Sequence, residues 1–274
     1  MADPFRSCIH SHTNFCDGKD TPEVMVKRAV ELGFVSLGIS SHGPTFWDQH
    51  DFSIHPDQVK PYQQELRRLG QVYGDRLEVL VGVEHDSLGE PVGEGYDYVI
   101  ESVHAMEVGG QLCYIDWDLE KTQTAVRECF GGDAYAYAKA YFQACAAAYE
   151  KNPAQIAGHL DLVSKFNERA PMFDTEDPRY LNAALEAMDC ALSCGLVPEV
   201  NTGAISRGYR TTPYPSVPIL KFLKDRNAPI VVTSDCHDAR YLDCWYNEAA
   251  ALLRSIGFKS TLRMRKSGWE EIGL

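Results

Sequence analysis

Histidines and carboxylates recur along this chain directly after short apolar runs. The set comprises His10, His12, Asp17, His42, Glu84, His104, His159, Asp235 and His237. Imidazole nitrogen combined with carboxylate oxygen suits zinc, iron or manganese rather than calcium or magnesium. These residues would therefore bind divalent metal ions if the fold brings them into one pocket.

Each member of the set has an ordinary explanation when it is taken alone. A single histidine near a loop is usually a hydrogen-bonded polar residue, and Asp17 in Asp17-Gly18-Lys19 is a common turn residue. The recurrence is harder to explain in this way. Six imidazoles and three carboxylates in one pocket need cations that offset the charge and use the nitrogen lone pairs. At three or four ligands per ion, with one carboxylate shared, the set matches two or three metal ions.

The elements that must position this set follow a βα pattern, in which short β-branched runs alternate with longer helical patterns. We expect strands that end near His10 and that span 34–40, 77–83, 96–103, 155–160, 196–200 and 229–233. A first helix opens at Asp20-Thr21-Pro22-Glu23 and ends at Gly33, because a capping hydroxyl and a proline favour a helix start and glycine favours its end. Further helices are expected at 56–73, 134–150, 178–194, 216–225 and 245–256. The stretch 109–132 looks like an insertion or a lid.

About seven βα units in a chain of 274 residues most simply close into an α/β barrel, with a doubly wound open sheet as the alternative. We find no linker or repeat, so we expect one domain over residues 1–274. The carboxyl ends of barrel strands meet at one mouth. Candidate ligands more than two hundred positions apart, from His10 to His237, would therefore share one pocket.

The amino-acid composition limits the kinds of partner that this protein can bind. Asp and Glu total 39 against 26 for Lys and Arg, a net charge of −13, and there is no basic run, so we expect no nucleic acid held by charge. The sequence contains no run of 18 apolar residues, the length needed to span a bilayer, and the N-terminus lacks a signal-peptide pattern. Nine cysteines without a CxxC pair indicate reduced thiols. A cytoplasmic protein is expected, and the oligomeric state stays open. The composition does not exclude a small phosphorylated substrate, because metal ions and one or two cations can offset its charge locally.

Phosphate monoester hydrolysis fits such a site. Metal ions offset the negative charge that shields the phosphorus, and they lower the pKa of a bound water towards about 7. Arg207 follows Asn201 at a predicted strand end, and Lys165 follows His159. We expect both cations to bind phosphate oxygens, with an ordinary loop arginine or lysine as the alternative.

Other polar residues near the predicted mouth have more than one interpretation. Glu101 or Asp161 could bind a substrate ammonium group, and Asp161 could instead orient a ligating imidazole. His85 follows Glu84 and should point away from the pocket, because side chains alternate along a strand. His50 and His55 are expected at the surface or in a substrate lid.

Several short motifs occur together in a fixed order. They are HxHTxxxDG from His10, SSHGP around His42, GxE ending at Glu84, SVHAM around His104, GHLDL around His159, NTGAxxRG from Asn201 followed by PYPS, and TSDCH ending at His237. Together, from Ile9 to about Leu253, they resemble the polymerase and histidinol phosphatase (PHP) family, most closely its monofunctional histidinol-phosphate phosphatases. This resemblance implies a distorted (βα)7 TIM-like barrel with a trinuclear metal centre. It also implies hydrolysis of L-histidinol phosphate to L-histidinol and phosphate, a step of histidine biosynthesis.

The resemblance also implies a division of the ligands. One metal would be held by His10, His12, Glu84 and Asp235, a second by Glu84, His104 and His159, and a third by Asp17, His42 and His237. Glu84, Asp235 and His237 would then be the catalytic residues, with Glu84 bridging two ions. His85-Asp86 and Glu101 depart from the smaller or apolar neighbours expected there, which affects the prediction of substrate specificity.

Three other functions share parts of this pattern. An amidohydrolase also opens with HxH, but its bridging group is usually a lysine, where this chain has Glu84. A phosphodiesterase or nuclease of the same family would need a basic track that is absent. A metal-stabilised module without activity is disfavoured because no candidate ligand is missing.

Overall fold

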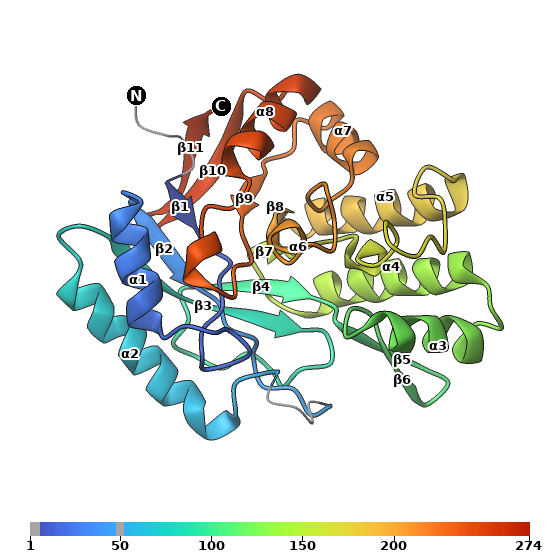
Figure 1. Ribbon diagram of the computed structural model, residues 1–274, viewed down its shortest axis with the longest axis horizontal. Helices are drawn as coiled ribbons and strands as arrows, with labels where there is room; N and C mark the ends of the chain where they lie inside the picture. Colours follow the sequence, from blue (N-terminus) through green and yellow to red (C-terminus); the bar gives the residue numbers. More distant parts are fainter. Residues whose placement is uncertain (1–5, 48–51) are drawn as a thin grey trace.

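The computed structural model describes residues 6–47 and 52–274, and one curved sheet carries most of its strands (Figure 1). Seven parallel strands alternate with helices: β1 (Ser7–Cys8), β2 (Ser36–Ile39), β3 (Glu78–Asp86), β4 (Tyr98–Ser102), β7 (Ile156–Ala157), β8 (Val197–Asn201) and β9 (Val231–Thr233). Strand β10 (Ser260–Arg265) also pairs in parallel with β9, and β11 (Gly268–Gly273) pairs antiparallel with β10. The sheet order is β1-β2-β3-β4-β7-β8-β9-β10-β11. The seven predicted parallel strands are therefore confirmed.

Most of the helices lie around the outside of this sheet (Figure 1). The helices are α1 (Pro22–Glu31), α2 (Val59–Val72), α3 (Leu119–Cys129), α4 (Ala134–Lys151), α5 (Pro178–Ser193), α6 (Gly203–Ser206), α7 (Val217–Asp225) and α8 (Tyr246–Ile256), with 3-10 turns at Pro56–Gln58, Leu162–Ser164 and Ala239–Tyr241. Helix α6 lies at the carboxyl end of β8, and α3 packs against the strand β6 (Gln111–Tyr114). The predicted start of α1 is confirmed, because the Thr21 side chain accepts a hydrogen bond from the backbone nitrogen of Val24 and Pro22 occupies the first turn. Within the described ranges, no helix is both long and apolar enough to cross a bilayer.

The strands alternate between two apolar layers. Val79 and Val81 of β3 face the helices, whereas Leu80 faces the interior of the curved sheet. The interior cluster comprises Ile9, Leu80, Tyr98, Ile100, Ile156, Val197, Val231 and Met264. The Tyr98 ring fills this space, and its hydroxyl donates a 2.6 Å hydrogen bond to the carbonyl of Ile9. Gly38 and Gly82 leave room for the ring, because a Cβ at either position would collide with it.

The two edges of the parallel sheet meet at a seam. Among the described residues no ladder joins β1 to β9; β10 pairs with β9 at Leu262 and Val231 and contacts β1. Beyond the strand ends an isolated parallel bridge joins Ser11 to Cys236, and the backbone nitrogen of His12 donates to the carbonyl of Cys236 at 2.8 Å. The two edges therefore approach each other as in a distorted α/β barrel, although among the described residues no ladder of strand pairs closes the ring. The open doubly wound alternative does not fit this meeting of the edges.

Two regions contain elements that the sequence did not predict. The stretch 109–132 is an ordered insertion: strand β5 (Ala105–Val108) turns at Gly109-Gly110 into β6 (Gln111–Tyr114), and α3 follows. The prediction also ended at residue 256 and missed the β10–β11 hairpin. Both regions contain short strands that pair locally, without the βα alternation on which the prediction relied.

Candidate metal centre

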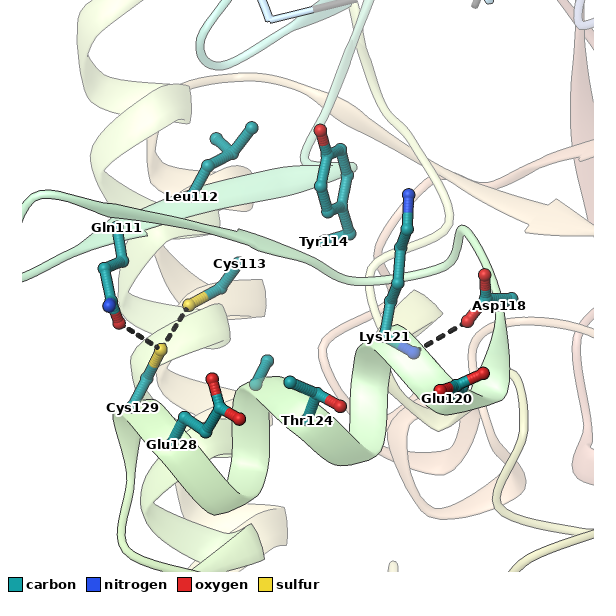
Figure 2. Close-up of a pocket in the computed structure, with 11 residues that line it drawn as sticks. Gln111, Leu112, Cys113, Tyr114, Asp118, Glu120, Lys121, Thr124, Glu128 and Cys129 are labelled. Atoms are coloured by element: carbon teal, nitrogen blue, oxygen red, sulfur yellow. Dashed lines mark hydrogen bonds between the residues drawn. The ribbon is translucent and has the colours of Figure 1, made fainter.

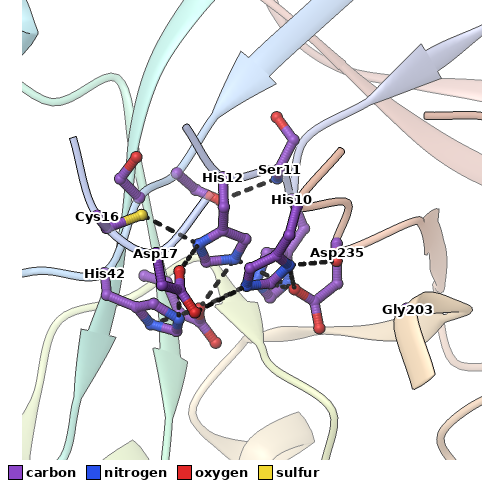
Figure 3. A network of polar contacts seen from close by, with 12 residues as sticks. His10, Ser11, His12, Cys16, Asp17, His42, Gly203 and Asp235 are labelled. Atoms are coloured by element: carbon purple, nitrogen blue, oxygen red, sulfur yellow. Dashed lines mark hydrogen bonds and ion pairs between the residues drawn. The ribbon is translucent and has the colours of Figure 1, made fainter. Parts of the chain in front are cut away.

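All nine predicted ligands lie together at the carboxyl ends of the parallel strands, and Figure 3 shows His10, His12, Asp17, His42 and Asp235 within one polar network. Glu84 is at its centre. Its Oε1 lies 3.0 Å from His159 Nε2 and 3.3 Å from His104 Nε2. Its Oε2 lies 3.1 Å from His10 Nε2 and 3.0 Å from His42 Nδ1. One carboxylate, from the end of β3, is thus in contact with imidazoles from four other strand ends.

Asp235 and Asp17 lie on opposite sides of His12. Oδ1 of Asp235 is 3.1 Å from His12 Nε2, and Oδ1 of Asp17 is 3.8 Å from His12 Nδ1. Asp17 also approaches His237, with 3.2 Å between Oδ2 and Nε2, and His42, with 3.7 Å between Oδ1 and Nε2. The two carboxylates place negative charge at the two ends of the cluster, as a site for several cations requires.

The cluster divides into overlapping groups in which the possible ligand atoms lie within 4.8 Å of one another. They are His12-Asp17-His42-His237, His10-Glu84-His159, His10-His12-Asp235 and His42-Glu84-His104. Asp17, His42 and His237 fall in one group, as expected for the third ion, with His12 beside them. His104 and His159 fall in different groups that share Glu84. The division of ligands among the ions therefore stays a prediction.

The donor set fits metal ions because several of its atoms lack any other partner. His10 Nε2, His12 Nε2 and both carboxylate oxygens of Glu84 are buried without a hydrogen-bond partner. Leaving an ionised carboxylate in this state costs several kcal/mol. Cations among these atoms would remove that cost.

The electrostatics of the imidazoles agree with this interpretation. Burial, together with His237 and His42, lowers the pKa of His12 to about 3, so the ring is neutral at physiological pH. Burial also acts to lower the pKa of His10, but Glu199, Glu84 and Asp235 outweigh it and hold that pKa well above its usual value. Positive charge is therefore favoured beside His10.

A strained turn directs the last two ligands. Asp235 has a φ of 44°, in the left-handed region that non-glycine residues seldom adopt. Gly203 packs against it, since a Cβ at Gly203 would lie 2.8 Å from the Asp235 Cβ. The chain can therefore turn sharply after β9, and both Asp235 and His237 reach the cluster.

Glu199 is a site residue that the sequence analysis missed. It is fully buried on β8, and its Oε2 accepts from His10 Nδ1 at 2.8 Å and from Thr233 Oγ1 at 2.7 Å. Its Oε1 accepts from the backbone nitrogen of His159 at 2.6 Å. Glu199 thus fixes the His10 ring with Nε2 towards the cluster. Its position two residues before Asn201 on a strand was the available signal, because alternation puts both on the inner face.

The contacts of Asp86 and Glu101 explain why polar residues stand where the resemblance led us to expect smaller or apolar ones. Asp86 Oδ2 accepts from the His104 backbone nitrogen at 2.9 Å and lies 3.2 Å from His104 Nδ1, so this carboxylate orients a candidate ligand. His85 points away from the cluster, as predicted. Its Nδ1 bonds Glu101 at 2.6 Å, and Asn152 donates to the same carboxylate at 2.7 Å. Glu101 is therefore not the ammonium-binding group suggested as one alternative.

Asp161 does not have the imidazole-orienting role considered for it. It is fully buried, its Oδ2 accepts from the backbone nitrogen of Ser216 at 2.9 Å, and no bond joins it to a ligand imidazole. His55 is exposed and bonds Asp57, in agreement with a surface position. His50 lies outside the described residues. Neighbouring residues in the sequence do not show which groups a side chain contacts, so only the packing of the fold separates the alternatives.

Arg207 and Lys165 both lie beside the cluster. The guanidinium of Arg207 donates to the Asp235 backbone oxygen at 3.0 Å and to its Oδ2 at 3.2 Å, and is 2.7 Å from His237 Nδ1. Lys165 Nζ donates to Oδ2 of Asp116 at 3.0 Å and to its backbone oxygen at 2.8 Å. The sequence placed both residues at the mouth but did not identify Asp116 as a partner.

A cavity of about 240 Å3 opens beside the cluster. Its walls are Asp17, Trp47, Phe52, His104, Tyr114, Asp116, Trp117 and Lys165. Two of these are candidate ligands, four are aromatic, and Asp116 and Lys165 form an ion pair. Tyr114, Asp116 and Trp117 come from the insertion between β4 and α4, which therefore forms one wall of the site.

Comparisons with known proteins agree with this geometry. The chain is 27% identical to the probable histidinol-phosphatase of Deinococcus radiodurans over 94% of its own length and 96% of that protein. It is 25% identical to the histidinol-phosphatase of Bacillus subtilis, over 84% and 92% of the two chains. Both relatives match over nearly their whole length, so the similarity is not confined to the motifs.

The fold has solved relatives as well. The histidinol phosphate phosphatase of Lactococcus lactis subsp. lactis, crystallised with zinc, L-histidinol and phosphate, superimposes with a TM-score of 0.74 at 19% identity, covering 97% of this chain and 99% of that one. The family model of the PHP domain matches residues 9–203, which include seven of the nine candidate ligands. The chain therefore belongs to the PHP domain family.

Proposed function

We propose that this protein is a metal-dependent phosphomonoesterase that hydrolyses L-histidinol phosphate to L-histidinol and phosphate. The observation that carries the proposal is the buried cluster of nine side chains whose central carboxylate has no hydrogen-bond partner. The histidinol-phosphatases of D. radiodurans and B. subtilis, which align along most of this chain, support the choice of substrate.

The nine ligands would hold two or three ions of zinc, iron or manganese, with Glu84 shared between two of them. When bound, such ions offset phosphate charge and lower the pKa of water, so that a nucleophile forms near neutral pH. Asp235 and His237 complete the side of the cluster that faces Arg207. Glu199 and Asp86 hold the His10 and His104 rings in fixed orientations. These rings therefore need not reorient during the reaction.

Arg207 is suited to bind the phosphate. Burial tends to lower the pKa of its guanidinium, but Asp235 raises it well above the usual range, so the positive charge is retained. Three of its contacts go to Asp235 and His237. A guanidinium has five N–H groups, and those that remain can donate to phosphate oxygens beside the cluster.

The neighbouring cavity is suited to the histidinol part of the substrate. Trp47, Phe52, Tyr114 and Trp117 offer flat surfaces on which an imidazole ring can stack. Burial tends to raise the pKa of Asp116, but Lys165 and His104 hold it below its usual value, so the carboxylate is ionised. We assign Asp116 to the substrate ammonium group, and Lys165, which pairs with it, to the phosphate side of the cavity.

The test is phosphate release from L-histidinol phosphate by protein assayed for bound metal, compared with a simple aryl phosphate and a phosphodiester. We expect the highest kcat/KM for L-histidinol phosphate. Asp116→Asn should raise KM for that substrate about tenfold, the size of one charge-assisted contact, and leave the aryl phosphate unaffected. Preference for the diester would favour the phosphodiesterase alternative. An unchanged KM of Asp116→Asn for L-histidinol phosphate would contradict the assignment of Asp116 to the ammonium group.

The remaining expectations concern the setting of the enzyme. We propose a single domain over residues 1–274 and a cytoplasmic enzyme without nucleic-acid or membrane partners. The net charge of −13 supports the absence of a polyanionic ligand. Gel-shift and size-exclusion measurements would test the partner and the oligomeric state.

A further inference from the structure

Two cysteines of the insertion lie in contact between β6 and α3. Cys113 is on β6, and Cys129 is the last residue of α3. Their sulfur atoms are 3.1 Å apart, and Cys129 Sγ also donates to Gln111 Oε1 at 3.4 Å (Figure 2). Sixteen positions separate the two residues in the sequence, so the contact is created by the folding of α3 against the hairpin.

The pair borders a cavity of about 610 Å3 that is lined by β6 and α3. Cys113 is 1% exposed, whereas Cys129 is half-buried. Burial raises the pKa of the Cys113 thiol to about 12, and the contact with Cys129 acts in the same direction. A small oxidant would therefore reach Cys129 first, and Cys113 would remain beside it as a thiol.

We propose that Cys113 and Cys129 are a modification site at which a peroxide forms a reversible disulfide. The Cys129 thiolate attacks one oxygen of hydrogen peroxide; an S–O bond forms, the O–O bond breaks, and hydroxide leaves and is protonated to water. The Cys113 sulfur then attacks the Cys129 sulfenic acid; the S–S bond forms, the S–O bond breaks, and the departing hydroxide takes the Cys113 proton as a second water. Two thiols are oxidised and one peroxide is reduced, and a thiol reductant reverses the change.

The position of the pair connects it to the active-site wall. Side chains alternate along β6, and Figure 2 shows Cys113 directed towards α3 while Tyr114 points to the opposite face. The disulfide would close the segment 114–128, which carries Tyr114, Asp116 and Trp117. Oxidation would thus restrict the wall of the proposed substrate cavity and leave the nine candidate metal ligands untouched.

Cys190 and Cys194 provide an internal comparison. They are four positions apart: Cys190 is in the last turn of α5, and Cys194, which is exposed, is the residue that follows the helix. The Cβ atoms of residues one helical turn apart are about 5–6 Å from each other, whereas a disulfide needs about 3.5–4.5 Å. Exposure alone therefore predicts oxidation of Cys194, and geometry predicts the Cys113–Cys129 bond.

Peptide mapping distinguishes these outcomes. Trypsin should release Cys113 in peptide 77–121 and Cys129 in peptide 128–139, each with one cysteine. After treatment of the folded, metal-loaded protein with hydrogen peroxide, we expect the two peptides joined, with the loss of two hydrogens, and separated again by a thiol reductant. The melting temperature should rise by about 5 °C, as expected for closing a loop of this length.

Matched variants complete the experiment. Cys129→Ser should abolish the joined peptide and the rise in melting temperature, whereas Cys194→Ser should retain both. Bound metal should be equal in the reduced and oxidised forms. Recovery of Cys129 unmodified or as a sulfinic acid from the folded wild-type protein would overturn the proposal, as would an equal yield of the joined peptide from protein unfolded in denaturant.

Discussion

The same strands build two very different regions at their two ends. Near the amino ends of the parallel strands, Leu80, Tyr98, Val197 and Val231 fill the barrel interior, and the hydroxyl of Tyr98 has its partner in the Ile9 carbonyl. At the carboxyl ends the interior is polar and equally buried, and both oxygens of Glu84 lack a hydrogen-bond partner.

The alternation of each strand produces this contrast. In β3 the inward residues are Leu80, Gly82 and Glu84, and in β9 and its continuation they are Val231, Thr233 and Asp235. Burial of the apolar ends favours folding, whereas burial of charge at the polar ends opposes it. The apolar end therefore stabilises a geometry that the polar end could not maintain alone, and metal binding should offset the remaining cost.

The largest effect is expected at the polar end. Glu84→Ala should reduce phosphatase activity at least about a thousandfold and remove bound metal, because the central ligand is lost. Metal analysis and steady-state kinetics provide the measurement. Glu84→Gln, which keeps the shape of the side chain and removes its charge, should lose metal and activity as well. Full activity of Glu84→Ala would refute the assigned site, and chelation of the wild type is the matched control.

The opposite pattern is expected at the apolar end. Tyr98→Ala should lower the free energy of unfolding by about 3–5 kcal/mol, because it leaves a large cavity in the interior. Tyr98→Phe should cost only about 1 kcal/mol, the value of one hydrogen bond. Denaturant unfolding measures both. The molecules that stay folded should bind metal normally, and loss of metal from folded Tyr98→Phe would contradict the separation of the two regions.

Glu199 lies between the two regions and should have an intermediate effect. Glu199→Gln should weaken metal binding about tenfold to a hundredfold, the usual cost of losing the carboxylate that orients a ligating imidazole. Titration of metal-free protein with zinc measures the change. Glu101→Gln is the matched control, because Glu101 is equally buried and bonds no candidate ligand. Equal losses in the two variants would indicate a general effect on folding.

The smallest effect is expected at the rim of the site. Arg207→Ala should raise KM for L-histidinol phosphate about tenfold while bound metal stays unchanged, because the arginine is assigned to the phosphate. Arg169→Ala is the control, since Arg169 is exposed and bonds the backbone oxygen of Gly208 in the same loop. A change in kcat and metal content with KM constant would make Arg207 a support of Asp235 instead.

The sequence was most informative where chemistry and strand ends coincide. The seven parallel strands and the meeting of nine candidate ligands were predicted, since barrel topology brings the carboxyl ends of strands together regardless of their distance in the chain. The insertion at 109–132 was predicted without its β5–β6 hairpin, and the β10–β11 hairpin was not predicted, because short antiparallel strands have weak patterns of their own.

The sequence by itself therefore determined the identity of the candidate ligands and the elements that hold them. Tertiary structure alone decided which carboxylates orient the candidate ligands. Glu199 and Asp86 orient His10 and His104, whereas Glu101 pairs with His85 away from the site. It also decided that Asp116 lies beside Lys165, and Cys113 beside Cys129. The reason is physical: residue type fixes what a group can bind, but the packing of distant segments fixes which partner it meets.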